Sequence, residues 1–173
     1  MKLPITIRRA ELGDVPAITD IYNEAILTTV ATFDTEVKTV ADREQWLRSH
    51  GERHPVLVAV VDGRVVGWAS LTEWSDRCAY SDTAEVSFYV KSEFRGQGLG
   101  RKLLEAIIDA GRNARLHSLL GRTAEGSDES LHLSYAAGFV LVGTMKEVGR
   151  KFGRLLDVHM VPLLLNPDIS RSS

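Results

Sequence analysis

The segment that decides the fold reads Glu85-Val86-Ser87-Phe88-Tyr89-Val90-Lys91-Ser92-Glu93-Phe94-Arg95-Gly96-Gln97-Gly98-Leu99-Gly100-Arg101-Lys102-Leu103-Leu104. Its first six residues predict a strand, with Val86, Phe88 and Val90 on one face and Glu85, Ser87 and Tyr89 on the other. Glycines at alternate positions then lead into a helix expected over residues 98–113. Glycine lets a ligand approach the backbone, and the free N–H groups at a helix start favour an anion. The segment therefore predicts a strand, loop and helix that bind a phosphate or pyrophosphate.

The glycine spacing alone leaves the ligand open. The loop lacks the Gly-Lys-Ser/Thr of a Walker A sequence. It also departs from the dinucleotide fingerprint, because Gly98 and Gly100 are separated by a single residue. Arg95 and Arg101 add positive charge at the rim. A tight turn that only packs the helix is the alternative interpretation.

Around this segment the sequence predicts a mixed sheet with helices on both faces. We expect strands at residues 5–8, 56–61, 64–69, 84–90, 116–123, 138–146 and 156–165. Helices are expected after Asp14, after a Thr39–Asp42 capping box, over residues 98–113 and over residues 128–137. Asp62-Gly63 between two β-branched runs predicts a tight hairpin. Hairpins followed by strand-helix-strand crossovers indicate an α/β (α+β) fold with a mostly antiparallel sheet of about seven strands.

Composition restricts the class of protein. The chain has 173 residues with a net charge of −2, and it lacks the basic surplus of a nucleic-acid-binding protein. We expect one domain over residues 1–165 and a polar tail over residues 166–173. Its one cysteine, Cys78, excludes an intramolecular disulfide and a Cys-rich zinc site, and no metal is expected. Apolar runs are too short for a membrane span or signal peptide, so we expect a cytoplasmic protein with no membrane partner.

The sequence Arg95-Gly96-Gln97-Gly98-Leu99-Gly100 resembles the Q/R-x-x-G-x-G/A motif of the GNAT superfamily of N-acetyltransferases, and the order of elements resembles the GNAT order. The resemblance implies acetyl-coenzyme A as co-substrate, with its pyrophosphate on the amides from Gly96 to Arg101. The pantetheine arm would pair with the strand as an added strand would, and the Val90 N–H would polarise the thioester. The implied cofactor-binding residues are Phe88, Tyr89, Val90, Arg95, Gly96, Gln97, Gly98, Leu99, Gly100, Arg101 and Ser127.

Further segments resemble the phosphinothricin and methionine sulfoximine acetyltransferase branch. They are Ile21–Ala25, Thr32–Glu36, Gly67–Ser70, Glu73-Trp74, Arg77–Tyr80, Thr83–Ser87 and Lys151–Arg154. The resemblance implies transfer to the α-amine of a small amino-acid-like compound, and a homodimer. Phe33 and Trp74 would wall the acceptor pocket, with Arg77 and Tyr80 near its mouth. As alternatives, the two aromatic residues belong to the core and Arg77 is a solvated loop charge.

An amine attacks a thioester only when it is neutral, so such an enzyme needs a proton acceptor. Glu85 is our candidate base, because it lies on the more polar strand face immediately before the expected cofactor segment. A glutamate at this position also matches the phosphinothricin acetyltransferase pattern. An exposed strand carboxylate without a catalytic role is the alternative.

One stretch departs from the GNAT pattern. Aligned on Gly138-Phe139, Ser127 stands where many members have asparagine, and Ser134 stands where they have tyrosine or histidine. Tyr135 is adjacent, but one helical residue turns a side chain by about 100°. The general acid is therefore open, and solvent could fill that role. Three rival hypotheses remain: transfer to a polyamine, aminoglycoside or protein N-terminus; a coenzyme-A-binding module without activity; and a nucleotide-binding protein.

Overall fold

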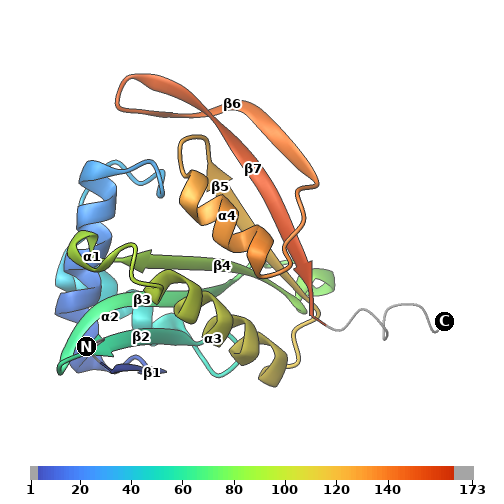
Figure 1. Cartoon of the computed structure of the whole chain (residues 1–173). Helices are drawn as coiled ribbons and strands as arrows, with labels where there is room; N and C mark the ends of the chain where they lie inside the picture. The colour runs from blue at the N-terminus through green and yellow to red at the C-terminus, as the bar shows by residue number, and fades with distance from the viewer. Residues whose placement is uncertain (1–3, 166–173) are drawn as a thin grey trace.

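The computed structural model describes residues 4–165 and contains one seven-stranded sheet in the order β1-β2-β3-β4-β5-β7-β6 (Figure 1). The strands are β1 (Ile5–Arg9), β2 (Val56–Val61), β3 (Arg64–Glu73), β4 (Thr83–Val90), β5 (Ser118–Ala124), β6 (Gly143–Lys151) and β7 (Arg154–Leu164). The helices are α1 (Val15–Thr28), α2 (Val40–Ser49), α3 (Leu99–Asn113) and α4 (Asp128–Ala136). Neighbouring strands are antiparallel except β4 and β5, which run parallel. The predicted fold class is confirmed.

Helices cover both faces of the sheet (Figure 1). On one face, Leu103 and Ile107 of α3 are fully buried in the larger core cluster, which also includes Leu57 of β2. On the other face, Ile18 of α1 packs with Val58 of β2 in a second cluster. Successive β2 side chains alternate between the two clusters, which explains why this strand reads as an uninterrupted apolar run. Burying each such side chain stabilises the fold by about 1.5–3 kcal/mol.

The sheet opens between β4 and β5. Antiparallel pairing with β3 extends along β4 from Ala84 to Val90, whereas parallel pairing with β5 covers only Thr83 to Glu85. The Lys91 N–H donates to the carbonyl of Val66 in β3 at 2.9 Å. Because backbone amides along a strand alternate in direction, the amides of the odd-numbered β4 residues also face β3. The amides of Phe88 and Val90 therefore point to the β5 side. Past Glu85, β4 thus presents backbone donors and acceptors to the gap where β5 diverges from it (Figure 1).

The closing hairpin differs from the prediction. The sequence predicted a strand over residues 138–146, but β6 is Gly143–Lys151, and a tight turn at Phe152 and Gly153 leads into β7. Both turn residues have positive φ, 50° and 74°. The prediction was wrong because β6 is an edge strand, mostly exposed and interrupted by a register shift, and it lacks a regular apolar alternation. The hairpin extends well beyond β5 (Figure 1).

Two of the predicted local motifs are confirmed, and the third, the start of a helix after Asp14, is confirmed in position but has no side-chain cap. The Thr39 hydroxyl accepts from the Asp42 N–H at 3.1 Å, and the Asp42 carboxylate accepts from the Thr39 N–H at 2.9 Å. Asp62 and Gly63 form the β2–β3 turn with φ of 50° and 71°. Asp14 occupies the N-cap position of α1, but its carboxylate accepts bonds from Arg8 at 2.7 and 2.9 Å instead. The Arg8 guanidinium lowers the pKa of Asp14.

Between residues 4 and 165, no helix is long and apolar enough to cross a bilayer. The same residues contain no group of three or more metal-ligating side chains. The predicted tail at residues 166–173 lies outside the described residues.

Candidate active site

Three cavities meet at Tyr89 of β4. The first, of about 420 Å³, contains Glu85, and we call it the Glu85 cavity. The second, of about 250 Å³, lies against the glycine segment, and we call it the glycine-loop cavity. A small one of about 50 Å³ lies in the β4–β5 gap, and we call it the gap cavity. All three share Ala31 and Tyr89 in their linings, so they lie next to one another beside the open part of β4.

The glycine-loop cavity lies against the turn that leads into α3. Its lining includes nine of the residues predicted to bind a cofactor: Phe88, Tyr89, Val90, Arg95, Gly96, Gly98, Gly100, Arg101 and Ser127. Gly96 and Gly98 have φ of 70° and 82°, a conformation in which side-chain-bearing residues are strained. Gly98 is the N-cap of α3 and gives it no side-chain cap. The first amides of α3 are thus available to an anion, as the sequence predicted.

The remaining two predicted cofactor residues lie elsewhere. The Leu99 side chain is buried in the larger core cluster, and the Gln97 amide donates to the Glu93 carbonyl at 3.3 Å. Any contact they make with a ligand in this cavity would come from their backbone. The third glycine has a packing role, because a Cβ at Gly100 would lie 3.1 Å from Leu133 Cδ1.

Side chains from separate parts of the chain build the Glu85 cavity. Its lining comprises Tyr22, Val30, Ala31, Thr32, Phe33, Asp34, Glu85, Ser87, Tyr89, Arg122, Ala124, Met145, Val148 and Val158. Glu85, Ser87 and Tyr89 share this lining, in agreement with the predicted polar face of the strand. The side chain of Glu85 is 21% exposed, so it is accessible from the cavity yet partly shielded from solvent.

Arg122 of β5 is a site residue that sequence reasoning missed. Its Nε and Nη2 donate to Oε1 of Glu85 at 2.9 and 2.8 Å, and Nη2 also donates to Oε2 at 2.8 Å. The parallel register sets Leu120 opposite Glu85, and the strand alternation turns Arg122 to the same face. The signal in the sequence was a lone charge inside an otherwise apolar strand.

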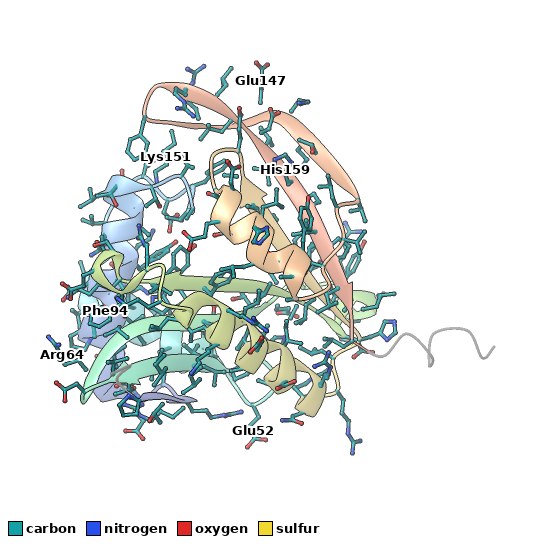
Figure 2. The ribbon with its side chains drawn as sticks, viewed as in Figure 1. Glu52, Arg64, Phe94, Glu147, Lys151 and His159 are labelled. Carbon is teal, nitrogen blue, oxygen red and sulfur yellow. The ribbon has the colours of Figure 1, made fainter. Side chains whose placement is uncertain are left out.

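The loop after α1 forms the outer wall of the Glu85 cavity. Tyr22 donates to Asp34 Oδ2 at 2.6 Å, and its hydroxyl lies 3.1 Å from Thr32 Oγ1. Burial raises the pKa of Tyr22 to about 12, so the phenol keeps its proton at neutral pH. On the far side, Lys151 Nζ donates to the Thr32 carbonyl at 2.7 Å, and burial lowers the pKa of this amine. Figure 2 shows Lys151 pointing from the hairpin toward this loop.

Phe33 lines the Glu85 cavity, as predicted for an acceptor-pocket residue. Its ring occupies the space that a Cβ on Gly149 of β6 would need. The hairpin therefore supports the ring from behind.

A buried cation fixes the tyrosines of the site. The guanidinium carbon of Arg43 lies 3.6 Å from the Trp46 ring centroid and 4.6 Å from that of Tyr22. Burial lowers the pKa of Arg43 to about 10, which still leaves it charged at neutral pH. Tyr22 packs edge-on against Tyr89 with centroids 5.3 Å apart. Cation–π and aromatic contacts thus hold Tyr89 in place, one of the two residues that all three cavities share.

Trp74, Arg77 and Tyr80 lie outside the linings of the three cavities. The Trp74 ring is 5.8 Å from the guanidinium carbon of Arg122, so it is one side chain removed from Glu85. Arg77 is the N-cap of a short 3-10 helix (Cys78–Tyr80), and Tyr80, its last residue, is exposed.

The two serines at the departures from the GNAT pattern face the site. Ser127 lines the glycine-loop and gap cavities, and Ser134 lines the gap cavity. The buried Ser134 hydroxyl donates to the Ser130 carbonyl at 2.9 Å. Tyr135 is exposed and outside these linings, as expected from the rotation of one residue along a helix.

Comparison with known proteins identifies the class. The sequence model of the acetyltransferase (GNAT) family matches residues 18–139. The chain therefore belongs to the GNAT family of acetyltransferases, enzymes that take the acetyl group from acetyl-coenzyme A, and the predicted resemblance is confirmed.

Within the family, two relatives and one solved structure have names that state an amino acid or an amino-acid-like compound as the acceptor. An L-amino acid N-acyltransferase of Escherichia coli is 37% identical over 94% of this chain and 95% of its own. A methionine sulfoximine/methionine sulfone acetyltransferase of Pseudomonas paraeruginosa is 37% identical over the same shares, 94% and 95%. A phosphinothricin acetyltransferase of Sinorhizobium meliloti, solved with acetyl-coenzyme A, is 30% identical with a TM-score of 0.91, over 98% of this chain and 93% of that one.

Proposed function

We propose that this enzyme transfers an acetyl group from acetyl-coenzyme A to the α-amine of a small amino-acid-like acceptor, such as methionine sulfoximine or phosphinothricin. One observation carries the proposal: a cavity at a glycine loop and a cavity containing a glutamate share Tyr89 in their linings and lie next to each other at the open part of β4. Such an arrangement lets two substrates enter from different sides and react where the cavities adjoin.

The glycine-loop cavity fits acetyl-coenzyme A. A pyrophosphate would be held by the amides that follow Gly96 and Gly98, with Arg95 and Arg101 adding positive charge. The free edge of β4 from Phe88 to Val90 would bind the pantetheine amides as a neighbouring strand does. The Val90 N–H would also donate to the thioester carbonyl.

Glu85 would act on the acceptor. Acetyl-coenzyme A supplies the acetyl group as a thioester. The acceptor ammonium gives one proton to Glu85, directly or through water, and the electron pair left on nitrogen forms the C–N bond as the C–S bond breaks. Sulfur leaves as a thiolate with the electron pair of the broken C–S bond. Nitrogen then loses a second proton, and the thiolate takes up one proton to become a thiol. One amide and one free thiol result.

An acceptor screen tests this proposal. The protein is incubated with acetyl-coenzyme A and single amines, and free thiol is measured. The panel contains methionine sulfoximine, phosphinothricin, a polyamine, an aminoglycoside and a peptide with a free N-terminus. We expect the amino acids to be turned over best. Preference for another amine would change the acceptor class, and coenzyme binding without thiol release would favour an inactive module.

We also propose a homodimer, as the family resemblance implies. Three apolar side chains of the closing hairpin support it, because Val148, Phe152 and Leu155 are 52%, 58% and 44% exposed. Light scattering on the full chain tests it, and a monomer at micromolar concentration would contradict it.

A further inference from the structure

Charge in the Glu85 cavity is concentrated in three side chains. Among the lining residues, Asp34 and Glu85 are acidic, and Arg122 is the one with a permanent positive charge. An α-amino acid carries one ammonium and one carboxylate. The cavity therefore offers carboxylates to the ammonium and a single guanidinium to the carboxylate.

That guanidinium is already engaged. Arg122 donates three hydrogen bonds to Glu85, at 2.8 to 2.9 Å, and they reach both carboxylate oxygens. A carboxylate has about four lone-pair positions, so most of those on Glu85 are occupied. The three bonds leave about one position free on Glu85, and they hold its carboxylate against Arg122. We call this resting arrangement, in which Arg122 binds both oxygens of the candidate base, the masked state.

We propose that Arg122 is the receptor for the acceptor's carboxylate, and that its transfer from Glu85 to that carboxylate exposes Glu85 to the ammonium. This inference rests on the proposed function. A guanidinium binds any carboxylate through the same two-pronged geometry, so the incoming group can replace Glu85 without loss of hydrogen bonds. The side chain of Arg122 is 49% exposed, which leaves it room to turn toward the cavity.

The exchange makes the enzyme selective for amino acids. An amine without a carboxylate offers Arg122 no replacement for Glu85, so the ion pair persists and the base stays masked. The charges also balance, because Arg122 keeps one anionic partner throughout. When Glu85 takes the ammonium proton, one N–H bond breaks, one O–H bond forms, and the electron pair stays on nitrogen.

The test compares methionine sulfoximine with its carboxamide, which has the same amine and side chain but no carboxylate. For the unmodified enzyme we expect kcat/KM to be at least about 30-fold higher with the acid, the range for a charged pair that loses one partner. In Arg122→Gln the acid should lose most of this advantage, while the carboxamide is unchanged or improved. The ratio between the two substrates should fall to within about 3-fold.

Controls separate this role from a structural one. Arg112→Gln removes an exposed arginine paired with Asp109 at the far end of α3, and it should leave the ratio unchanged. Arg122→Lys keeps the charge without the fork and should give an intermediate ratio. Calorimetric titration of methionine sulfoximine into enzyme with bound coenzyme A should show weaker binding in Arg122→Gln. The affinity for acetyl-coenzyme A should be unchanged, which reports on folding.

An Arg122→Gln enzyme that loses activity equally on both substrates would overturn the proposal. So would one that keeps the wild-type ratio. A wild-type protein that releases no thiol with any amine would instead overturn the proposed function, and the carboxylate exchange with it.

Discussion

The glycine-loop cavity and the Glu85 cavity share Tyr89 but are constructed differently. The first takes eight of its seventeen lining residues from one continuous segment, residues 88–101, and three of these are glycines, which offer a ligand only backbone polar atoms. The second takes its polar lining from side chains on α1, the loop after α1, β4 and β5, with the β6–β7 hairpin behind them. A backbone-built site depends on local conformation. A side-chain-built site depends on how distant segments pack.

The difference suits the two substrates that we propose. The pyrophosphate of the cofactor is the same whichever acceptor is used, so fixed amides at a helix start suffice to bind it. An acceptor amine varies in side chain, and a cavity walled by exchangeable side chains can be adapted without touching the cofactor segment. Mutations in the two cavities should therefore have separable effects. Those in the glycine-loop cavity should change the affinity for acetyl-coenzyme A, and those in the Glu85 cavity should change the kinetics with the acceptor.

The largest effect should come from Glu85→Gln. Loss of a general base typically costs about 100- to 10,000-fold in rate, and we expect kcat to fall within that range. Acetyl-coenzyme A affinity, measured by calorimetry, should change by less than about 3-fold, since Glu85 lies outside the glycine-loop cavity. Glu44→Gln, in an exposed pair with Arg48 on α2, serves as the control. Unchanged turnover would remove Glu85 from the mechanism.

Gly98→Val should affect the other side. Valine is strained at the φ of 82° that Gly98 adopts, at a cost of about 1–3 kcal/mol. We expect acetyl-coenzyme A to bind roughly tenfold more weakly, with the acceptor KM unchanged at saturating acetyl-coenzyme A. Gly51→Val is the matched control, because a Cβ there meets no atom within 4 Å and no positive φ is required. Wild-type affinity in Gly98→Val would show that this turn does not hold the pyrophosphate.

The same contrast explains what could be predicted from the sequence. Glycine positions, strand alternation and the Asp62-Gly63 turn are local signals, so the order of elements and the glycine-loop cavity could be predicted from them. Arg122 was missed because its contact with Glu85 spans 37 positions and depends on the parallel register between β4 and β5. Lys151 was noted only as part of a family segment, since nothing local predicts that its amine reaches Thr32.

β6 shows a second reason why prediction fell short. An edge strand exposed on both sides carries no apolar alternation, so its limits could not be read from side-chain pattern. The strand nonetheless shapes the site, because it bears Gly149 behind Phe33 and ends at Lys151. Residues that act by supporting another residue leave a weaker trace in sequence than residues that contact a ligand.

Gly149→Ala tests that support directly. The added methyl would overlap the Phe33 ring and push it from its place in the cavity wall. We expect the acceptor KM to rise about tenfold, the range for a pocket that loses one well-placed apolar contact, while acetyl-coenzyme A affinity stays unchanged. Gly143→Ala, on the same strand with no atom within 4 Å of its Cβ, should behave as wild type. A normal acceptor KM in Gly149→Ala would mean that Phe33 does not contact the acceptor.

Lys151→Met should give the smallest effect on the acceptor side. The substitution removes the hydrogen bond to the Thr32 carbonyl, but methionine has a similar length and fills the buried space. The loop keeps its other attachments, since Tyr22 still bonds Asp34 and the Asn23 amide still bonds the backbone of Lys38 at 2.8 and 2.9 Å. We therefore expect the acceptor KM to rise only about 3-fold.

Hydrogen exchange provides the sharper readout of this variant. Amides of residues 30–36 should exchange faster in Lys151→Met, because the loop opens more often once one of its attachments is lost. Lys146→Met is the control, since Lys146 lies on the same hairpin but forms an exposed pair with Asp157, and Figure 2 shows neighbouring Glu147 pointing outward from the hairpin. Equal exchange in the two variants would show that the hairpin does not hold the acceptor loop. The hairpin would then contribute to the Glu85 cavity only through its lining residues Met145, Val148 and Val158 and through the Gly149 contact with Phe33.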